Sequence, residues 1–261
     1  MQITYYIIFI LGTGCIALPT KFGPGHYKNT GFRIYGGHDA KAGDNPHMCS
    51  LRVSGEHLCG ASIISSQWVV TSAHCIYGQP AANLLLRCGT LLREVPGYDF
   101  HLELVISHEN YTAPMHDNDI GLLQIIGEFE LGTPAIDKIY LPEQDIDIAP
   151  VGAFATATGW GLNASQIYPE KLQTVDLPVI DRVICVQDYE RWMPVTDKMF
   201  CAGYDQGQKD ACGGDSGGPL KYNDTLVGIV SWGQGCAQPH YPGVYTRVSK
   251  FRNWIRKYTQ I

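Results

Sequence analysis

The sequence predicts an all-β fold made of two six-stranded antiparallel β-barrels followed by a C-terminal α-helix. Short β-rich runs, separated by Gly, Pro, Asn and Asp, fill the chain after residue 45. A strand-poor connector over residues 127–150 divides these runs into two sets of six. Closing each set into a barrel would remove its exposed strand edges, so two barrels are the expected arrangement.

The first barrel is expected over about residues 45–126 and the second over about residues 151–247. The first six runs read "MCSLRVS", "HLCGASIIS", "WVVTSA", "LLLRCG", "HLELVISH" and "IGLLQI". The second six read "AFATATGWG", "LQTVDLPVI", "MFCAGY", "GGPLKYN", "TLVGIVSWG" and "GVYTRV". The end of the chain differs, because Phe251, Trp254, Ile255 and Tyr258 recur at helical spacing. This pattern predicts an amphipathic helix over about residues 248–260 that packs on the barrels.

The N-terminus is typical of a secretory signal peptide over residues 1–17. An apolar run over residues 3–18 ends in small residues, which places the expected cleavage after Ala17. The run is shorter than a membrane span and is interrupted by "GTG", so a signal-anchor is the weaker alternative. We therefore expect a secreted, extracellular protein without a membrane anchor.

Charge and cysteine content narrow the function classes. From residue 34 onward there are 16 Lys and Arg against 25 Asp and Glu, which argues against nucleic-acid binding and mildly favours cationic substrates. Removing Cys15 with the signal peptide leaves an even eight of the nine cysteines, as expected in an oxidising compartment. The cysteines are scattered without a CxxC pair, so a zinc site built on them is not expected. Sequons at Asn110, Asn163 and Asn223 are candidate glycosylation sites.

Three fragments carry residues for nucleophilic catalysis. "GDSGGP" contains Ser216 between glycines, "TSAHC" offers His74 as a base, and "DNDIGLL" offers Asp119 as an orienting acid. Each fragment alone is a weak signal. Together, with "ATGWG" and "MFCAGY", they resemble the trypsin-like (chymotrypsin-fold) serine endopeptidases from residue 34 to the C-terminus.

The resemblance implies a role for each of these residues. Ser216 Oγ would attack the scissile carbonyl, His74 would take and return its proton, and Asp119 would orient His74. The backbone N–H groups of Gly214 and Ser216 would form the oxyanion hole. The active site is then expected in the cleft between the two barrels.

The resemblance also implies activation by proteolysis. Cleavage after Arg33 would remove an activation propeptide at residues 18–33 and leave a protease domain at residues 34–261. The freed amine of Ile34 would insert beside Asp215. Tyr35 stands where the family usually has Val.

Before that cleavage the resemblance implies a latch. Ser50 and His57 occupy the positions of the zymogen pairing that holds Asp215, so His57 is expected to be a latch and not a second base.

Asp210 lies at the family position that forms the base of the specificity pocket, where a buried carboxylate pairs with Arg or Lys of the substrate. Ala211 replaces a serine common in trypsins, which tilts the expected preference towards Arg. The other expected substrate-binding residues are Ser231, Trp232, Gly233 and Gly243.

The resemblance implies three disulfide bonds, which are Cys59–Cys75, Cys185–Cys201 and Cys212–Cys236. Cys49 and Cys88 have no counterpart in the usual framework and fall on apolar faces of first-barrel strands. An oxidising compartment favours a bond between them, and two buried free thiols are the alternative.

No cofactor or metal is expected. The loop after Gly89 lacks the first acidic ligand of the family's calcium site, and Pro242 argues against sodium activation. The expected partners are polypeptides with Arg or Lys at the cleavage site and protein protease inhibitors, and the expected state is a monomer. Two other functions compete: a non-catalytic homologue that binds partners, and a disulfide-stapled matrix module. Neither explains why His74, Asp119 and Ser216 occur together.

Overall fold

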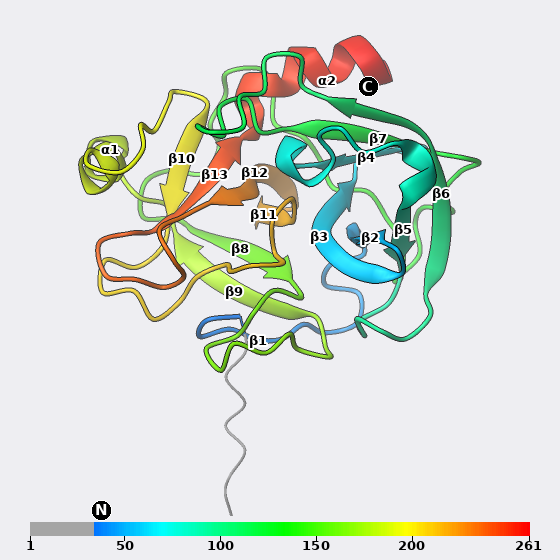
Figure 1. The fold of residues 1–261 in the computed structure, drawn as a ribbon, viewed down its shortest axis with the longest axis horizontal. Coiled ribbons are helices and arrows are strands. Elements are labelled where there is room, and N and C mark those ends of the chain that lie inside the picture. The colour runs from blue at the N-terminus through cyan, green and yellow to red at the C-terminus, as the bar shows by residue number, and fades with distance from the viewer. Residues whose placement is uncertain (1–33) are drawn as a thin grey trace, which may run out of the picture. The chain divides into compact units, whose positions relative to one another are not determined.

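Residues 34–261 are described by the computed structural model and form two β-sheet units with a short C-terminal helix (Figure 1). The all-β fold class is therefore as predicted. The expected signal peptide (residues 1–17) and propeptide (residues 18–33) lie outside the described residues.

The first unit is a closed antiparallel barrel with the strand order β2-β3-β4-β7-β6-β5. Its strands are β2 (Met48–Val53), β3 (Glu56–Ile63), β4 (Trp68–Thr71), β5 (Leu84–Cys88), β6 (Tyr98–Ser107) and β7 (Gly121–Ile125). Alternation fixes the inward face: Leu84, Leu86 and Cys88 on β5 are buried, whereas the residues between them are partly exposed. Closure leaves this unit without a free strand edge.

The second unit is a sheet of seven strands in the order β1-β9-β8-β11-β12-β13-β10. Its strands are β1 (His38–Asp39), β8 (Phe154–Gly159), β9 (Gln173–Pro178), β10 (Met199–Ala202), β11 (Pro219–Tyr222), β12 (Thr225–Trp232) and β13 (Gly243–Arg247). Six of them match the predicted set, and the two-residue β1 is an addition. Just beyond β9, Val179 forms an isolated antiparallel bridge with Ala202, so the end of β9 also contacts the edge strand β10.

The helices are short. Two α-helices, α1 (Arg182–Tyr189) and α2 (Arg252–Thr259), accompany the 3-10 turns η1 (Ala73–Cys75), η2 (Ala81–Asn83) and η3 (Val248–Phe251). The side chain of Asp181 accepts a hydrogen bond from Val183 N at 2.8 Å and so caps the start of α1. No sequence pattern had predicted α1.

The C-terminal helix packs as its periodicity predicts. Val248, Phe251 and Ile255 are buried in an apolar cluster with Val70 of the first unit and Ile229 of the second. Because this cluster draws on both units, it fixes them against each other. Burying a side chain of this size stabilises the fold by about 1.5–3 kcal/mol.

The two units meet where β3 approaches the segment before β11. Gly60 N donates to Ser216 O at 2.8 Å, and a Cβ at Gly60 would lie only 2.6 Å from Gly218 Cα. Only glycine allows the two backbones to approach so closely. This contact places Ser216, which comes from the second unit, against the first unit.

Four disulfide bonds connect the eight cysteines of residues 34–261, namely Cys49–Cys88, Cys59–Cys75, Cys185–Cys201 and Cys212–Cys236. The pair outside the usual framework joins adjacent strands, since Cys49 of β2 lies opposite Cys88 of β5. Both residues are fully buried, so this bond cross-links two strands inside the first barrel.

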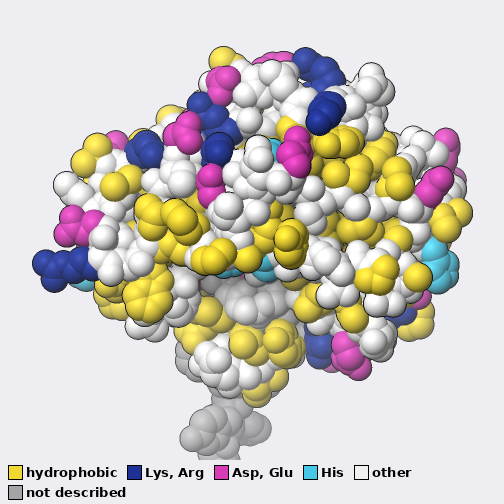
Figure 2. All heavy atoms as spheres, turned by 45° about the horizontal axis from the view of Figure 1, so that its top comes forward, with side chains coloured by type: hydrophobic (Ala, Val, Ile, Leu, Met, Phe, Trp, Pro, Cys, Tyr) yellow, Lys and Arg dark blue, Asp and Glu magenta, His cyan; other side chains and the backbone are white. Residues whose placement is uncertain are grey.

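The surface carries both signs of charge. On the face drawn in Figure 2, acidic and basic side chains are interspersed and exposed hydrophobic side chains lie between them. Within residues 34–261, every helix is too short or too polar to cross a membrane.

Candidate active site

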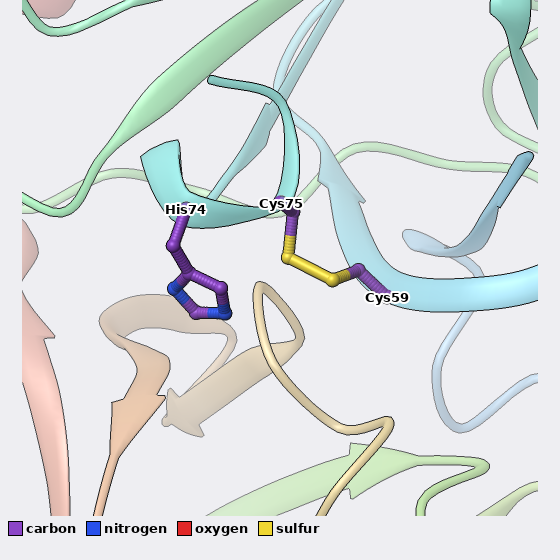
Figure 3. A group of neighbouring side chains, drawn as sticks. All are labelled: Cys59, His74 and Cys75. Atoms are coloured by element: carbon purple, nitrogen blue, oxygen red, sulfur yellow. A yellow bond between two sulfur atoms is a disulfide. The ribbon is translucent and has the colours of Figure 1, made fainter. Parts of the chain in front are cut away.

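His74 lies on η1, directly after β4, with its side chain 22% exposed. Its neighbour Cys75 is bonded to Cys59 of β3, so the turn that carries the imidazole is fixed covalently to the barrel (Figure 3). His74 N donates to Asp119 Oδ1 at 2.9 Å, which fixes the backbone of the turn as well. Backbone and neighbour are thus both restrained, and the imidazole is held in one place.

Asp119 precedes β7 and its side chain is fully buried. Its Oδ2 lies 2.7 Å from His74 Nδ1. Burial alone would raise the pKa of Asp119, but the interactions with His116, His74 and Ser231 outweigh it and hold that pKa well below its ordinary value. The carboxylate is therefore ionised and can only accept, so the His74 proton sits on Nδ1 and leaves Nε2 free to act as a base.

Two supports of Asp119 come from the second unit. Ser231 Oγ donates to Asp119 Oδ2 at 2.6 Å, and Thr246 Oγ1 donates to the Asp119 carbonyl at 2.7 Å. Ser231 was expected among the substrate-binding residues, and although it lines the pocket, its side chain is bonded to Asp119. Thr246 was not predicted, because a threonine in a strand carries no distinguishing signal.

Ser216 is half-buried between Asp215 and the glycines that precede β11. Within the described residues, its Oγ makes no hydrogen bond to His74, a separation common in enzymes before substrate binds. Three backbone N–H groups near Ser216 are already used, because Asp215 N, Gly217 N and Gly218 N all donate to carbonyls. Gly214 N and Ser216 N donate to no group in residues 34–261, so both remain available to an incoming oxyanion.

Gly214 adopts a φ of +96°, and a Cβ there would lie 2.8 Å from Tyr168 Cε1. Its carbonyl is 2.9 Å from His57 Nε2, and Ser50 Oγ is 2.8 Å from His57 Nδ1. Burial lowers the pKa of His57 to about 4, so the ring is neutral at pH 7. A carbonyl only accepts, so Nε2 donates to Gly214 and Nδ1 accepts from Ser50. The structure thus brings Ser50 and His57 together, and they hold Gly214, not Asp215.

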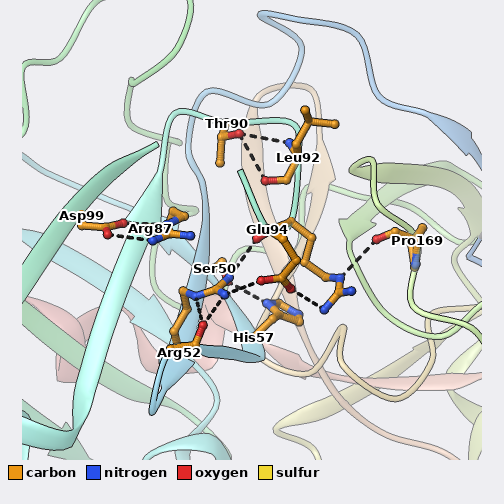
Figure 4. A network of polar contacts seen from close by, with 11 residues as sticks. Ser50, Arg52, His57, Arg87, Thr90, Leu92, Glu94, Asp99 and Pro169 are labelled. Carbon is orange, nitrogen blue, oxygen red and sulfur yellow. Dashed lines mark hydrogen bonds and ion pairs between the residues drawn. The ribbon is translucent and has the colours of Figure 1, made fainter. Parts of the chain in front are cut away.

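A polar network surrounds this histidine (Figure 4). Arg52 is almost fully buried and binds Glu94 Oε2 at 2.8 Å. Arg93 N donates to Glu170 O at 2.8 Å, and its guanidinium lies over the Tyr168 ring. The loop after Gly89 is therefore tied to the segment that packs on Gly214.

Asp215 is buried with no basic side chain bonded to it among residues 34–261. Its Oδ1 accepts from Gly161 N at 2.7 Å and its Oδ2 from Cys212 N at 2.9 Å. Burial outweighs these two donors and raises the pKa of Asp215 to about 7. A cation placed beside this carboxyl group would favour its ionised form.

Ile34 is the first described residue, and it is fully buried in the apolar core of the second unit with Ala157 and Ala211. Tyr35 O accepts from Asp210 N at 3.1 Å, and Tyr35 Oη accepts from Gln166 Nε2 at 2.7 Å. Residues 34 and 35 are therefore seated against the loop that carries Asp210. Arg33, the expected cleavage residue, lies outside the described residues.

A cavity of about 170 Å³ is lined by both Asp210 and Ser216. Asp210 Oδ2 accepts from Ala237 N at 2.8 Å, but its buried Oδ1 has no partner in the described part of the chain. Burial raises the pKa of Asp210 to about 7 against the opposing effect of the Ala237 and Ala211 amides. This cavity therefore contains a buried carboxyl group with one oxygen unpaired among the described residues.

The pocket walls fit an extended side chain. Ala211, Trp232, Gly233 and Gly243 all line the cavity. A Cβ on Gly243 would lie 2.8 Å from Asp210 Oδ1, so only glycine leaves room beside that oxygen. A Cβ at Gly233 would make only ordinary van der Waals contact, with Gly235 O at 3.6 Å.

A larger hollow of about 260 Å³ lies beside the connector, between residues 142–151 and the strand ends near Val179 and Phe200. Its lining is mostly aliphatic and includes none of the predicted site residues. It is therefore not the candidate active site.

The sequons differ in exposure. Asn110 and Asn223 are exposed, whereas Asn163 is half-buried and its Oδ1 accepts from Ser165 N and Ile167 N. Asn163 already stabilises its own turn, so of the three it is the least suited to carry a glycan.

Within residues 34–261, two groups of side chains have metal-ligand character: Cys59 with His74 and Cys75, and His74 with His116 and Asp119. The first cannot supply thiolates, because its cysteines are joined in a disulfide (Figure 3). His116 was not singled out from the sequence.

Two β-sheet units, with a histidine–aspartate pair on one and a serine beside a cavity on the other, define the class: a serine endopeptidase of the chymotrypsin fold. Comparison with known proteins gives the family, since residues 34–255 match the Trypsin family model. The chain belongs to the trypsin family.

The relatives include both short and long proteins. The chain is 44% identical over 227 residues to Trypsin Blo t 3 of Blomia tropicalis, which covers 85% of each chain. It is 40% identical over 237 residues to Trypsin of Phaedon cochleariae, covering 89% of this chain and 91% of that protein. The identity to Transmembrane protease serine 11B of Homo sapiens is also 40% over 237 residues, covering 88% of this chain but 56% of that protein.

Proposed function

We propose that this trypsin-family enzyme is a secreted zymogen that, once cleaved after Arg33, hydrolyses peptide bonds after Arg and Lys through Ser216, His74 and Asp119. That it is a serine endopeptidase acting on polypeptides follows from its family. The triad, the specificity and the activation are the proposal.

The reaction follows from the proton positions. His74 Nε2 takes the proton of Ser216 Oγ as that oxygen attacks the carbonyl carbon of the substrate. The ionised Asp119 stabilises the imidazolium through its 2.7 Å contact with Nδ1. The free amides of Gly214 and Ser216 bind the oxyanion, and His74 then returns the proton to the leaving amine.

Specificity rests on one observation, the unpartnered Oδ1 of Asp210 in the same cavity as Ser216. A buried carboxylate is costly until a cation neutralises it, and the guanidinium of Arg can do so bidentately. Ala211 offers no hydroxyl to solvate the compact ammonium of Lys, which favours Arg over Lys.

Activation rests on Asp215. Its carboxylate is buried with two amide donors and a raised pKa, so a new N-terminal ammonium beside it would form a strong ion pair. The burial of Ile34 and the contact of Tyr35 with Asp210 support insertion of that terminus. The apolar N-terminal run, which is typical of a signal peptide, favours secretion.

The experiment compares hydrolysis of Arg-, Lys- and Phe-amide substrates by the activated wild type and Asp210→Ser. We expect the wild type to prefer Arg, then Lys. Loss of one partner of a buried charge pair should cost Arg cleavage about 2–5 kcal/mol in transition-state terms in the variant. Asp205→Ser, which removes an exposed carboxylate, is the control and should keep the wild-type order. A wild type that prefers Phe, or a variant that keeps its Arg preference, would refute the specificity. An activated wild type that fails to react with a fluorophosphonate would instead support the non-catalytic alternative.

A further inference from the structure

His116 lies beside the catalytic pair, and the proposed reaction gives it no role. Its Nδ1 is shielded from solvent and has no hydrogen-bond partner within residues 34–261. Leaving a buried polar atom unpaired destabilises a protein. Such an atom calls for an explanation, and an unidentified ion is one of the usual ones.

The ring of His116 is oriented towards the catalytic pair. It meets the His74 ring edge to face, with centroids 5.3 Å apart and planes at 88°. Its Nδ1 lies 3.8 Å from Asp119 Oδ2, too far for a hydrogen bond. One ring nitrogen of each histidine and one carboxylate oxygen of Asp119 all lie within 4.8 Å of one another. Two imidazoles and a carboxylate thus lie close enough together to be considered as ligands of one ion.

This set of donors is the one that zinc binds, at about 2.0–2.2 Å from each ligand, with a further position open to water. Small rotations of the two rings would bring the nitrogens to that distance. The side chains of His74 and His116 are 22% and 28% exposed, so an ion can reach them from solvent. Asp119 supplies the negative charge behind them.

We propose that His74, His116 and Asp119 form a site for a divalent ion of the Zn²⁺ class, and that binding there reversibly inhibits the enzyme. The inhibitory part rests on the proposed function, because it acts by capturing the base. A metal on His74 Nδ1 forces the single proton of the neutral ring onto Nε2, and a metal on Nε2 occupies that lone pair directly. In either case the imidazole can no longer accept the proton of Ser216.

The first test titrates ZnCl₂ into the activated enzyme after removal of metal by a chelator, with Arg-amide hydrolysis as the readout. Each variant is normalised to its own zinc-free rate. His116→Asn is the test variant, since asparagine tolerates the φ of +49° at this position. His240→Asn is the matched control, because His240 also has a positive φ and lies 2.9 Å from a carboxylate, that of Asp205.

We expect wild type and His240→Asn to be inhibited at the same zinc concentration and to recover with EDTA. His116→Asn should need at least about 10-fold more zinc, since even outer-shell partners of a metal change its affinity by that factor. Equal inhibition of all three proteins, or none of the wild type, would overturn the inhibitory site.

The second test measures zinc binding without catalysis, by calorimetry on the full-length Ser216→Ala chain with and without His116→Asn. A zinc affinity that is at least about 10-fold weaker in the double variant supports the site. Absent binding, or binding indifferent to His116, overturns it. A protein that binds zinc through His116 but hydrolyses no amide would overturn the proposed function and leave the metal site intact.

Discussion

Ser231 Oγ donates a 2.6 Å hydrogen bond to Asp119 Oδ2 across the boundary between the two β units. The same oxygen lies 2.7 Å from His74 Nδ1, so the orientation of the proposed base depends on a strand from the second unit. The pair of His74 and Asp119 is therefore fully supported only when both units are folded and docked.

Removal of this hydroxyl is expected to weaken the pair. A hydrogen bond to a charged group is worth about 1.5–3 kcal/mol, so Ser231→Ala should lower kcat/KM for an Arg-amide roughly 10- to 100-fold. Ser249→Ala is the matched control, because Ser249 on η3 also donates a hydrogen bond of 2.6 Å to a carboxylate, that of Asp147. Unchanged kcat/KM for Ser231→Ala would show that Asp119 holds His74 without it.

The activation step is expected to depend on residue 33. Arg33→Gln should be secreted but inactive, because no ammonium would reach Asp215, and an unpaired buried partner costs about 3–5 kcal/mol. Arg33→Lys keeps a cleavable residue and should still be activated by a protease that accepts Lys. Amidase activity of the uncleaved Arg33→Gln chain would contradict this account.

The raised pKa of Asp215 predicts a pH dependence of the uncleaved chain. Between its unfolded value near 4 and about 7 in the folded protein, the folded state binds the extra proton. Stability from this group is thus full below the unfolded pKa and is lost as pH rises to about 7, by at most about 1.4 kcal/mol per pH unit.

Other groups oppose this trend, because burial lowers the pKa of His57 to about 4. The contribution of Asp215 is therefore taken from the difference in unfolding free energy between two proteins that differ only at residue 215. Urea unfolding of Arg33→Gln and of Arg33→Gln/Asp215→Asn should show the second chain gaining relative stability from pH 4 to pH 7. A difference that stays constant with pH would mean that a cation already pairs with Asp215.

The bond between Cys49 and Cys88 is expected to stabilise the first barrel. It closes a loop with a sequence separation of 39 between two buried residues, so replacing both by Ala should lower the free energy of unfolding by about 2–4 kcal/mol. Equilibrium unfolding measures the loss. Peptide mapping without reductant should find the two cysteines in one linked fragment of the wild type, and alkylatable thiols there would contradict the bond.

The strands could be predicted because they are short β-rich runs separated by Gly, Pro, Asn and Asp. The "GDSGGP", "TSAHC" and "DNDIGLL" fragments indicated the residues of the candidate site. α1 was not predicted because its apolar residues do not mark one face: Val183 and Ile184 are 63% and 50% exposed, whereas Cys185 and Tyr189 are buried. What holds it is a cap from Asp181 and the Cys185–Cys201 bond, and neither leaves a periodic signal.

The sequence could not predict which residues contact the pair formed by His74 and Asp119. Ser231 and Thr246 reach Asp119 across more than 100 residues, and His116 turns towards His74 from a loop. Such contacts depend on how the two units dock. No periodicity or spacing in a single sequence indicates how the two units dock.

The most direct test of the catalytic proposal is the rate of Arg-amide hydrolysis by the activated Ser216→Ala enzyme beside the activated wild type. Without the nucleophile, only the oxyanion amides and the binding contacts remain, which support roughly 10³–10⁴-fold over the uncatalysed reaction. The account predicts that turnover by the variant falls to that residual level while Arg-amide binding persists. Wild-type turnover by Ser216→Ala would contradict it.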